Sequence, residues 1–148
     1  LIVLSRKDFC SWANVARLEN SGVFFSLPES PQTLEEEKGI AWQFLHLFGH
    51  AFGLRDEEKY IIAKADSRAR TPGRPNCASN IEEASLWWGD MVETYPARVG
   101  YYFGCGGNVS FIKPTKGSLM NFGDLEYFVP DYGPVSERYL VNLLGFYF

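Results

Sequence analysis

The sequence is short of several residue types and features that would each point to a class of function. Its 148 residues include only two histidines, two methionines and three cysteines. No apolar run approaches the length of a membrane-spanning helix. Lysine and arginine number 14 against 18 acidic residues, so the net charge is −4, and the cations are scattered along the chain. These absences exclude a membrane span and argue against nucleic acid as a partner.

What is present describes a folded domain. Hydrophobic residues make up 46% of the chain and charged residues 22%, which is typical of a soluble protein. The length suits one hydrophobic core, so we expect a single domain over residues 1–148. The chain opens with LIVLSRKDF, which lacks an initiating methionine and predicts a strand, not a signal peptide. We therefore expect a piece of a longer protein.

The three cysteines leave at least one without a partner within the chain. Cys77 and Cys105 both lie in segments rich in Gly, Pro or Asn, where a short bridge often holds irregular chain together. This predicts a disulfide between them and leaves Cys10 over. The alternative for each cysteine is a lone thiol.

The first third of the chain predicts strands followed by one long helix. The apolar runs LIVLS and SGVFFSLP predict two short strands, and SWANVARLEN between them fits either a helical turn or an irregular connection. A helix is predicted from about residue 34 to 52, because Thr33 and Glu36 can form a capping box at its start and Gly53 can end it. Apolar residues recur at three- and four-residue spacing along it, at Ile40, Phe44, Leu47, Phe48 and Ala51.

The remainder of the chain is less regular. Residues 56–80 are charged and then rich in Pro, Gly and Asn, which predicts an excursion from the core. The segment IEEASLWWGDMV predicts a short helix, and the aromatic, glycine-rich residues 101–133 predict loops with short strands. Pro134 begins a predicted C-terminal helix over about 134–144. The expected fold class is therefore α+β.

His46 and His50, the only histidines, are four residues apart on the predicted helix. Side chains at this spacing share a helix face, so both imidazoles can bind one metal ion. Asp56, ten residues after His46 and beyond the turn at Gly53, is the first carboxylate able to reach the same ion. Three protein ligands leave one position open for water, as in catalytic zinc sites. The alternatives are a histidine pair on the helix surface and a solvated acid in a charged loop.

His46, His50, Gly53 and Asp56 resemble the metzincin pattern of zinc peptidases. That pattern has two histidines on a helix, a turn glycine, and a third ligand ten residues after the first. Within the clan, the chain is most similar to the M64 family, the IgA-peptidase-like metallopeptidases. Further segments resemble that family in order along nearly the whole chain: FGHAFGLRDEE, RPNCASN, WWGD, GYYFGC, KPTKGSLMNFG and YGPVSERYL.

The resemblance implies a zinc-dependent endopeptidase fold, with a twisted mixed β-sheet over an active-site helix and a second helix at the C-terminus. GSLMN resembles the Met-turn, which would make Met120 an apolar floor beneath the metal, whereas a methionine that only fills the core is the alternative. GVFFSLP would be the edge strand that holds an extended peptide substrate, with an interior strand as the alternative. The edge-strand residues would be Val23, Phe24, Phe25 and Ser26.

Leu47 occupies the position where the family implies a glutamate. That glutamate is the general base, which takes a proton from the attacking water and passes it to the leaving amine. Leucine has no group that accepts a proton, and losing a general base costs roughly 10²- to 10⁴-fold in rate. Leu47 also lies on the apolar stripe of the helix, so it removes chemistry without damaging the helix. Glu57 or Glu58 could replace the base only within hydrogen-bond reach of the water.

Three functions therefore compete. The first, which we favour, is a zinc-binding domain of the metallopeptidase type with impaired hydrolysis that still binds a peptide or protein. The second is a working zinc endopeptidase that uses another base. The third is a metal-free peptide- or protein-binding module on the same scaffold. The resemblance and the predicted disulfide favour a secreted or cell-envelope location.

Overall fold

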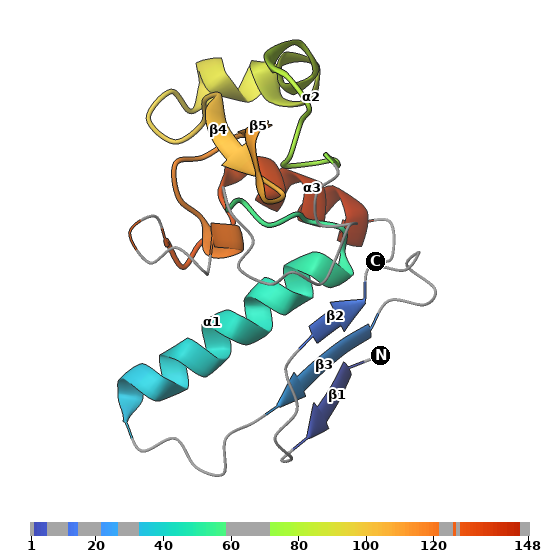
Figure 1. Ribbon diagram of the computed structural model, residues 1–148, viewed down its shortest axis with the longest axis vertical. Coiled ribbons are helices and arrows are strands. Elements are labelled where there is room, and N and C mark those ends of the chain that lie inside the picture. Colours follow the sequence, from blue (N-terminus) through green and yellow to red (C-terminus); the bar gives the residue numbers. More distant parts are fainter. Residues whose placement is uncertain are drawn as a thin grey trace. The chain divides into compact units, whose positions relative to one another are not determined.

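The computed structural model describes residues 2–5, 12–14, 22–26, 33–58, 72–121, 126 and 128–145. These residues contain α-helices and two small β-sheets, so the predicted α+β class is confirmed. Contacts divide the chain into two compact units, Leu1–Gly53 and Leu54–Phe148 (Figure 1). Compact units need not fold independently, so the single domain stays a prediction.

The first unit contains a mixed three-stranded sheet. Its strands are β1 (Ile2–Ser5), β2 (Trp12–Asn14) and β3 (Gly22–Ser26), in the order β1-β3-β2. β1 runs parallel to β3, and β2 runs antiparallel to it. The sequence predicted only two of these strands. The prediction of a helical turn or irregular connection is wrong at Trp12–Asn14, because a strand of three residues is too short to show an alternation of apolar and polar side chains.

The strand predicted to hold a substrate is the central strand. Val23 is paired with Ile2 of β1 on one side and with Ala13 of β2 on the other. An edge strand binds a peptide through free main-chain groups, and the main chain of β3 is engaged with both neighbouring strands. The edge-strand prediction is therefore wrong and the interior alternative is correct. It concerned Val23, Phe24, Phe25 and Ser26.

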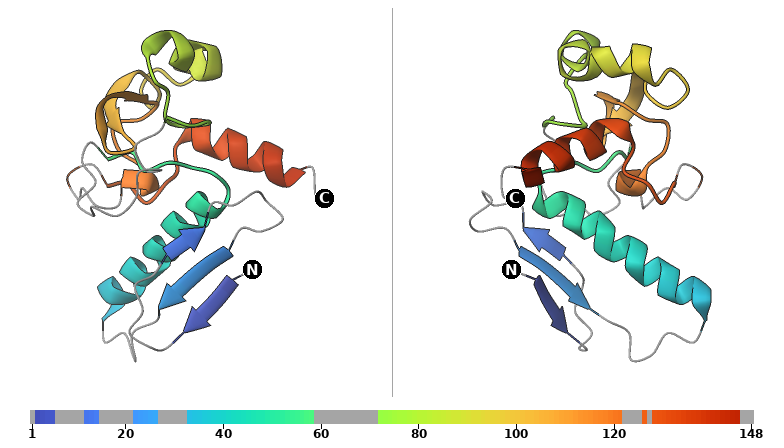
Figure 2. Two further views of the ribbon diagram at one scale, coloured as in Figure 1. Left: turned by 45° about the vertical axis from the view of Figure 1, so that its right-hand side comes forward. Right: turned by 180° about the vertical axis from the view of Figure 1, so that it is seen from behind.

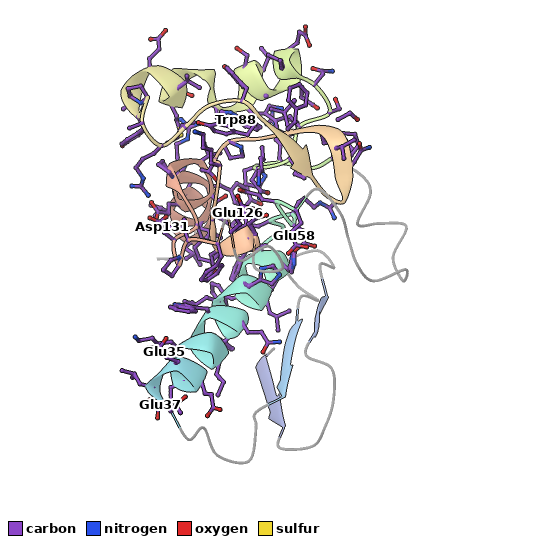
Figure 3. All side chains as sticks on the ribbon, turned by 60° about the vertical axis from the view of Figure 1, so that its left-hand side comes forward. Glu35, Glu37, Glu58, Trp88, Glu126 and Asp131 are labelled. Carbon is purple, nitrogen blue, oxygen red and sulfur yellow. A yellow bond between two sulfur atoms is a disulfide. The ribbon has the colours of Figure 1, made fainter. Side chains whose placement is uncertain are left out.

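Helix α1 (Leu34–Ala51) begins where its sequence predicts. The Thr33 hydroxyl accepts a hydrogen bond from the Glu36 amide, and the Glu36 carboxylate accepts one from the Thr33 amide, both at 3.2 Å. This is the predicted capping box. Glu35 and Glu37 extend from the same turn toward solvent (Figure 3), where negative charge stabilises the positive end of the helix dipole.

The apolar stripe of α1 forms the core of the first unit. Leu47 and Ala51 are buried, and three partly buried side chains pack against them, Ile40, Phe44 and Phe52. The helix lies along the sheet and contacts β2 and β3 (Figures 1 and 2). Gly53 ends the helix with φ of 95°, a left-handed conformation that glycine adopts without the strain a side chain would cause.

The second unit contains the remaining elements. These are helix α2 (Ile81–Thr94), the antiparallel strands β4 (Tyr102–Cys105) and β5 (Asn108–Lys113), a 3-10 turn η3 (Leu119–Asn121) and helix α3 (Pro134–Gly145). The predicted short helix, the short strands within glycine-rich chain and the C-terminal helix are thus confirmed.

The core of the second unit is built around Trp88. This indole is fully buried, and its Nε1–H donates to the Gly100 carbonyl at 3.0 Å, which satisfies its one polar group. Figure 3 shows Trp88 between α2 and the strands. The buried side chains clustered with it are Ala78, Ala84, Met91, Val99, Ile112 and Val135.

Cys77 and Cys105 form a disulfide across 28 residues, as predicted. Both are fully buried, and the bridge joins the chain before α2 to the end of β4. Cys10, the predicted leftover cysteine, lies outside the described residues. The disulfide is compatible with an extracellular location. Among the described residues, no helix combines the length and the apolar character needed to cross a membrane.

Candidate metal centre

The two histidines lie on the last turns of α1, on one face of the helix. Both are half-buried, and their Nε2 atoms are 3.1 Å apart. Their rings meet edge to face, with centroids 4.6 Å apart. Residues four apart on a helix are neighbours on its surface, so this arrangement follows directly from the sequence spacing. The predicted histidine pair is therefore formed.

Asp56 completes the group after the turn at Gly53. One ligand atom from each of His46, His50 and Asp56 lies within 4.8 Å of the others. Asp56 is half-buried, like the histidines. The three residues belong to one short piece of continuous chain, and together they could hold a metal ion.

The spacing of these atoms fits a transition-metal site. Ligand atoms about 2.0–2.2 Å from a tetrahedral ion are roughly 3.3–3.6 Å from one another. The separation of 3.1 Å between the two Nε2 atoms is close to this value, and 4.8 Å as the outer limit leaves only a small movement of the carboxylate. Two imidazoles and a carboxylate suit zinc and other divalent transition metals alike.

The backbone around Asp56 is held by hydrogen bonds. Its carbonyl accepts from the Gly106 amide at 2.7 Å, and the Glu58 carbonyl accepts from the Gly107 amide at 3.1 Å. On the preceding residue, both the amide and the carbonyl of Arg55 bond to the Asn76 side chain. Hydrogen bonds thus hold the main chain that carries the candidate ligand.

Glu57 is the centre of a buried polar network. Its carboxylate accepts from the Thr115 hydroxyl at 2.8 Å, the Ser118 hydroxyl at 2.9 Å and the Asn76 amide at 3.0 Å. The Lys113 ammonium donates to the Glu57 carbonyl at 2.6 Å. Burial raises the pKa of the Glu57 carboxyl, while the positive charge of Lys113 and the three hydrogen bonds act in the opposite direction.

This network makes Glu57 a structural residue. A general base must be within reach of the attacking water, whereas this carboxylate is fully buried and already accepts three hydrogen bonds. The role of substitute base considered for Glu57 is therefore disfavoured. The sequence does not indicate this network, because Asp56, Glu57 and Glu58 form a charged run, which is typical of a solvated loop.

Met120 is fully buried in η3, next to this network. Its amide donates to the Ser118 hydroxyl, and its carbonyl accepts from the Glu57 amide at 2.8 Å. The turn that carries Met120 is therefore bonded to the residue after Asp56. The role of Met120 as a floor beneath a metal stays a prediction.

Leu47, where the family resemblance implies a glutamate, is 8% exposed and belongs to the core of the first unit. Its neighbours His46 and Phe48 are half-buried. Leu47 forms this core together with Ala51, and Phe44 packs against the pair. The prediction that it serves the helix as an apolar residue is confirmed.

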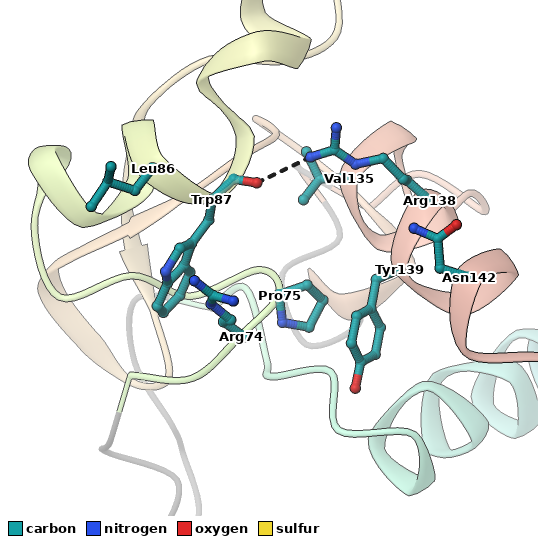
Figure 4. A pocket seen from close by; sticks show the side chains of 8 residues that line it. All are labelled: Arg74, Pro75, Leu86, Trp87, Val135, Arg138, Tyr139 and Asn142. Atoms are coloured by element: carbon teal, nitrogen blue, oxygen red, sulfur yellow. Dashed lines mark hydrogen bonds between the residues drawn. The ribbon is translucent and has the colours of Figure 1, made fainter. Parts of the chain in front are cut away.

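The second unit contains a cavity of about 240 Å³ that none of the three candidate ligands lines (Figure 4). It is lined by residues of α2, of α3 and of the loop that carries Arg74 and Pro75. The Arg138 guanidinium on its wall is bonded to Asp90 and to the Trp87 carbonyl, and Arg74 lies 5.1 Å above the Trp87 ring. The lining holds no histidine and no acidic residue, so it offers no metal site.

No family model matches the chain, and no curated protein matches it. The M64 resemblance therefore rests on the quoted motifs.

Proposed function

We propose that this chain is a zinc-binding domain of the metallopeptidase type, of the M64 family in the metzincin clan, with impaired peptide hydrolysis. The observation that carries the proposal is the convergence of His46, His50 and Asp56, whose ligand atoms lie within 4.8 Å. The alternative, a histidine pair on the helix surface, does not account for a carboxylate from beyond the helix that lies close to both rings. The fit of all three to one ion favours a metal site.

Each residue then has a defined role. His46 and His50 bind through the Nε2 atoms that face each other, and Asp56 supplies an oxygen. Zinc, when bound, would polarise a substrate carbonyl and lower the pKa of a water molecule. Leu47 can neither accept nor deliver a proton, so proton transfer lacks its usual carrier. Binding of a peptide or protein without efficient cleavage is the function we infer.

The finer fold assignment belongs to the same proposal. The mixed sheet along α1, the buried turn at Met120 and the C-terminal helix α3 agree with a metzincin fold. The Cys77–Cys105 disulfide supports a secreted or cell-envelope location.

The two alternative functions, a working endopeptidase and a metal-free binding module, predict different experimental results. A working endopeptidase needs another base, and the hydrogen bonds of the Glu57 carboxylate count against the nearest buried candidate. A metal-free binding module would keep the scaffold without using the His, His, Asp group. Metal content separates it from the first proposal, and peptide turnover separates the working enzyme.

The metal can be tested by elemental analysis. We expect about one zinc per chain after equilibration with zinc and removal of the excess. His46→Ala and His50→Ala should each lose this zinc, because two remaining ligands bind weakly. Gln43→Ala, a change on the same helix outside the ligand group, is the matched control and should retain it. Folded wild-type protein with almost no zinc would contradict the proposal and favour the metal-free module.

A further inference from the structure

We propose that the Cys77–Cys105 disulfide positions Asp56, the third candidate ligand, and thereby sets the metal affinity of the site. This inference rests on the proposed function, because it concerns the same His, His, Asp group. Neither cysteine is a ligand. The disulfide acts through the residues next to each cysteine, which hold the main chain on both sides of Asp56.

On one side, Asn76 precedes Cys77 and holds the residue before Asp56. The Asn76 Oδ1 accepts from the Arg55 amide at 2.9 Å, and its Nδ2 donates to the Arg55 carbonyl at 2.8 Å. The same Nδ2 donates to Glu57 Oε1 at 3.0 Å. One fully buried side chain thus holds the main chain directly before the ligand and the carboxylate of the residue directly after it.

On the other side, Gly106 follows Cys105 and holds Asp56 itself. Its amide donates to the Asp56 carbonyl at 2.7 Å, and the next amide, of Gly107, donates to the Glu58 carbonyl at 3.1 Å. Both glycines have positive φ, of 57° and 68°, in the tight turn between β4 and β5. Glycine adopts this conformation readily, and the turn directs two successive amides at one stretch of chain.

The disulfide joins these two supports to each other. Residues 55–58 form no helix or strand of their own, so hydrogen bonds hold them in place. Met120 and Lys113 bond to the main chain of Glu57, whereas Asn76 and the Gly106 turn hold Arg55 and Asp56. Without the bridge, the loop before α2 would still be paired with β5 through the two Ala78–Ile112 backbone hydrogen bonds, at 2.8 and 2.9 Å. The two supports would be joined less firmly, and a shift between them would weaken their hydrogen bonds to residues 55–58. An Asp side chain has only two rotatable bonds, so a displaced backbone carries the carboxylate away from the histidines. Residues that orient a ligand typically change metal affinity by about 10- to 100-fold.

The test compares zinc affinity of the wild-type protein with that of the double variant Cys77→Ala/Cys105→Ala. Substitution is preferable to reduction, because free thiolates would bind zinc themselves. Competition with a chromophoric chelator measures the dissociation constant. We expect affinity about tenfold weaker or more in the double variant, with the stoichiometry at saturation unchanged. Amide hydrogen exchange should show lost protection at Gly106 and Glu57, whose amides bond to Asp56 and Met120 in the wild type.

Met91→Ala is the matched control for a general loss of stability. Met91 is buried in the Trp88 core of the same unit, so truncating it loosens the unit without deleting a side chain that bonds to residues 55–58. It should leave zinc affinity within about twofold of the wild type. If the double variant fails to fold, two other variants replace it. Cys77→Val/Cys105→Ala fills more of the space that the disulfide occupied. Asn76→Ala removes one support of Asp56 while the disulfide stays.

The outcomes separate the two proposals. Wild-type protein that binds no zinc overturns the proposed function and the inference with it. Wild-type binding with unchanged affinity in the folded disulfide variant, or in Asn76→Ala where that is the folded variant, overturns the inference alone. Equal weakening in Met91→Ala also overturns it, because general loosening then explains the effect.

Discussion

Within one turn of helix, His46 is a candidate metal ligand and Leu47 is a core residue that cannot transfer a proton. It lies next to His46 in sequence, yet its side chain is 8% exposed and packs in the core of the first unit. The carboxylate of a glutamate at this position would either be buried away from water or move toward the histidines. The position thus contributes to the stability of the first unit, and under the proposed function the same leucine accounts for the absent general base.

Leu47→Glu should create or raise zinc-dependent peptidase activity, since it restores the group that accepts a proton. Leu47→Gln is the control, because it is equally polar but has no basic carboxylate. Both variants should lose roughly 2–5 kcal/mol of stability through the deleted apolar contacts and the buried polar group. The assay is cleavage of a fluorogenic peptide library with and without a zinc chelator.

Two results would count against this account of Leu47. If the glutamate variant folds, binds zinc and cleaves nothing more than the wild type, the site has diverged at other positions too. If the wild type already cleaves peptides at a rate that the variant does not exceed, another residue is the base.

Helix α1 is the element that the sequence predicts best, because its signals are local. The capping box needs only residues three apart, and the histidine pair only residues four apart. Both therefore appear in the structure as predicted. The C-terminal helix and the glycine stop at Gly53 follow the same logic.

Features that depend on distant partners could not be predicted in the same way. The Glu57 network joins residues 58 and 61 positions apart, Thr115 and Ser118, and nothing in a DEE run indicates such partners. Similarly, the apolar run of β3 predicts a strand but does not say which strands will flank it. The disulfide was an exception, because glycine- and proline-rich surroundings together with only three cysteines left few pairings.

Thr33→Ala should destabilise α1 by about 1 kcal/mol, because the Glu36 amide loses its side-chain acceptor. Zinc affinity should stay within about twofold, since His46 lies 13 residues further along, roughly 20 Å at the helical rise per residue. Glu37→Ala, an exposed change in the same turn, should cost only a few tenths of a kcal/mol. Thermal unfolding and chelator competition measure the two effects. A large loss of zinc binding in Thr33→Ala would mean that the histidine pair depends on the whole helix.

For the whole molecule, all three candidate ligands fall within the short stretch of chain from His46 to Asp56. Two ligands are fixed by the regular geometry of a helix. The third depends on a loop supported by a disulfide and a buried carboxylate. A metal bound by all three would therefore bind the folded chain more tightly than the unfolded chain.

This coupling predicts that zinc stabilises the protein against unfolding. Free zinc at about 100 times its dissociation constant should add about 2.7 kcal/mol to the free energy of unfolding, provided that the unfolded chain binds it weakly. The midpoint of thermal unfolding should rise with zinc in the wild type and in Leu47→Gln, and fall back when a chelator is added. In the double variant His46→Ala/His50→Ala, the midpoint should not change with zinc. This variant also reveals any effect of zinc on the unfolded chain that does not depend on the two histidines. If zinc leaves the wild-type midpoint as unchanged as that of the double variant, the His, His, Asp group does not bind zinc. The metal-free binding module would then be the better description of the chain.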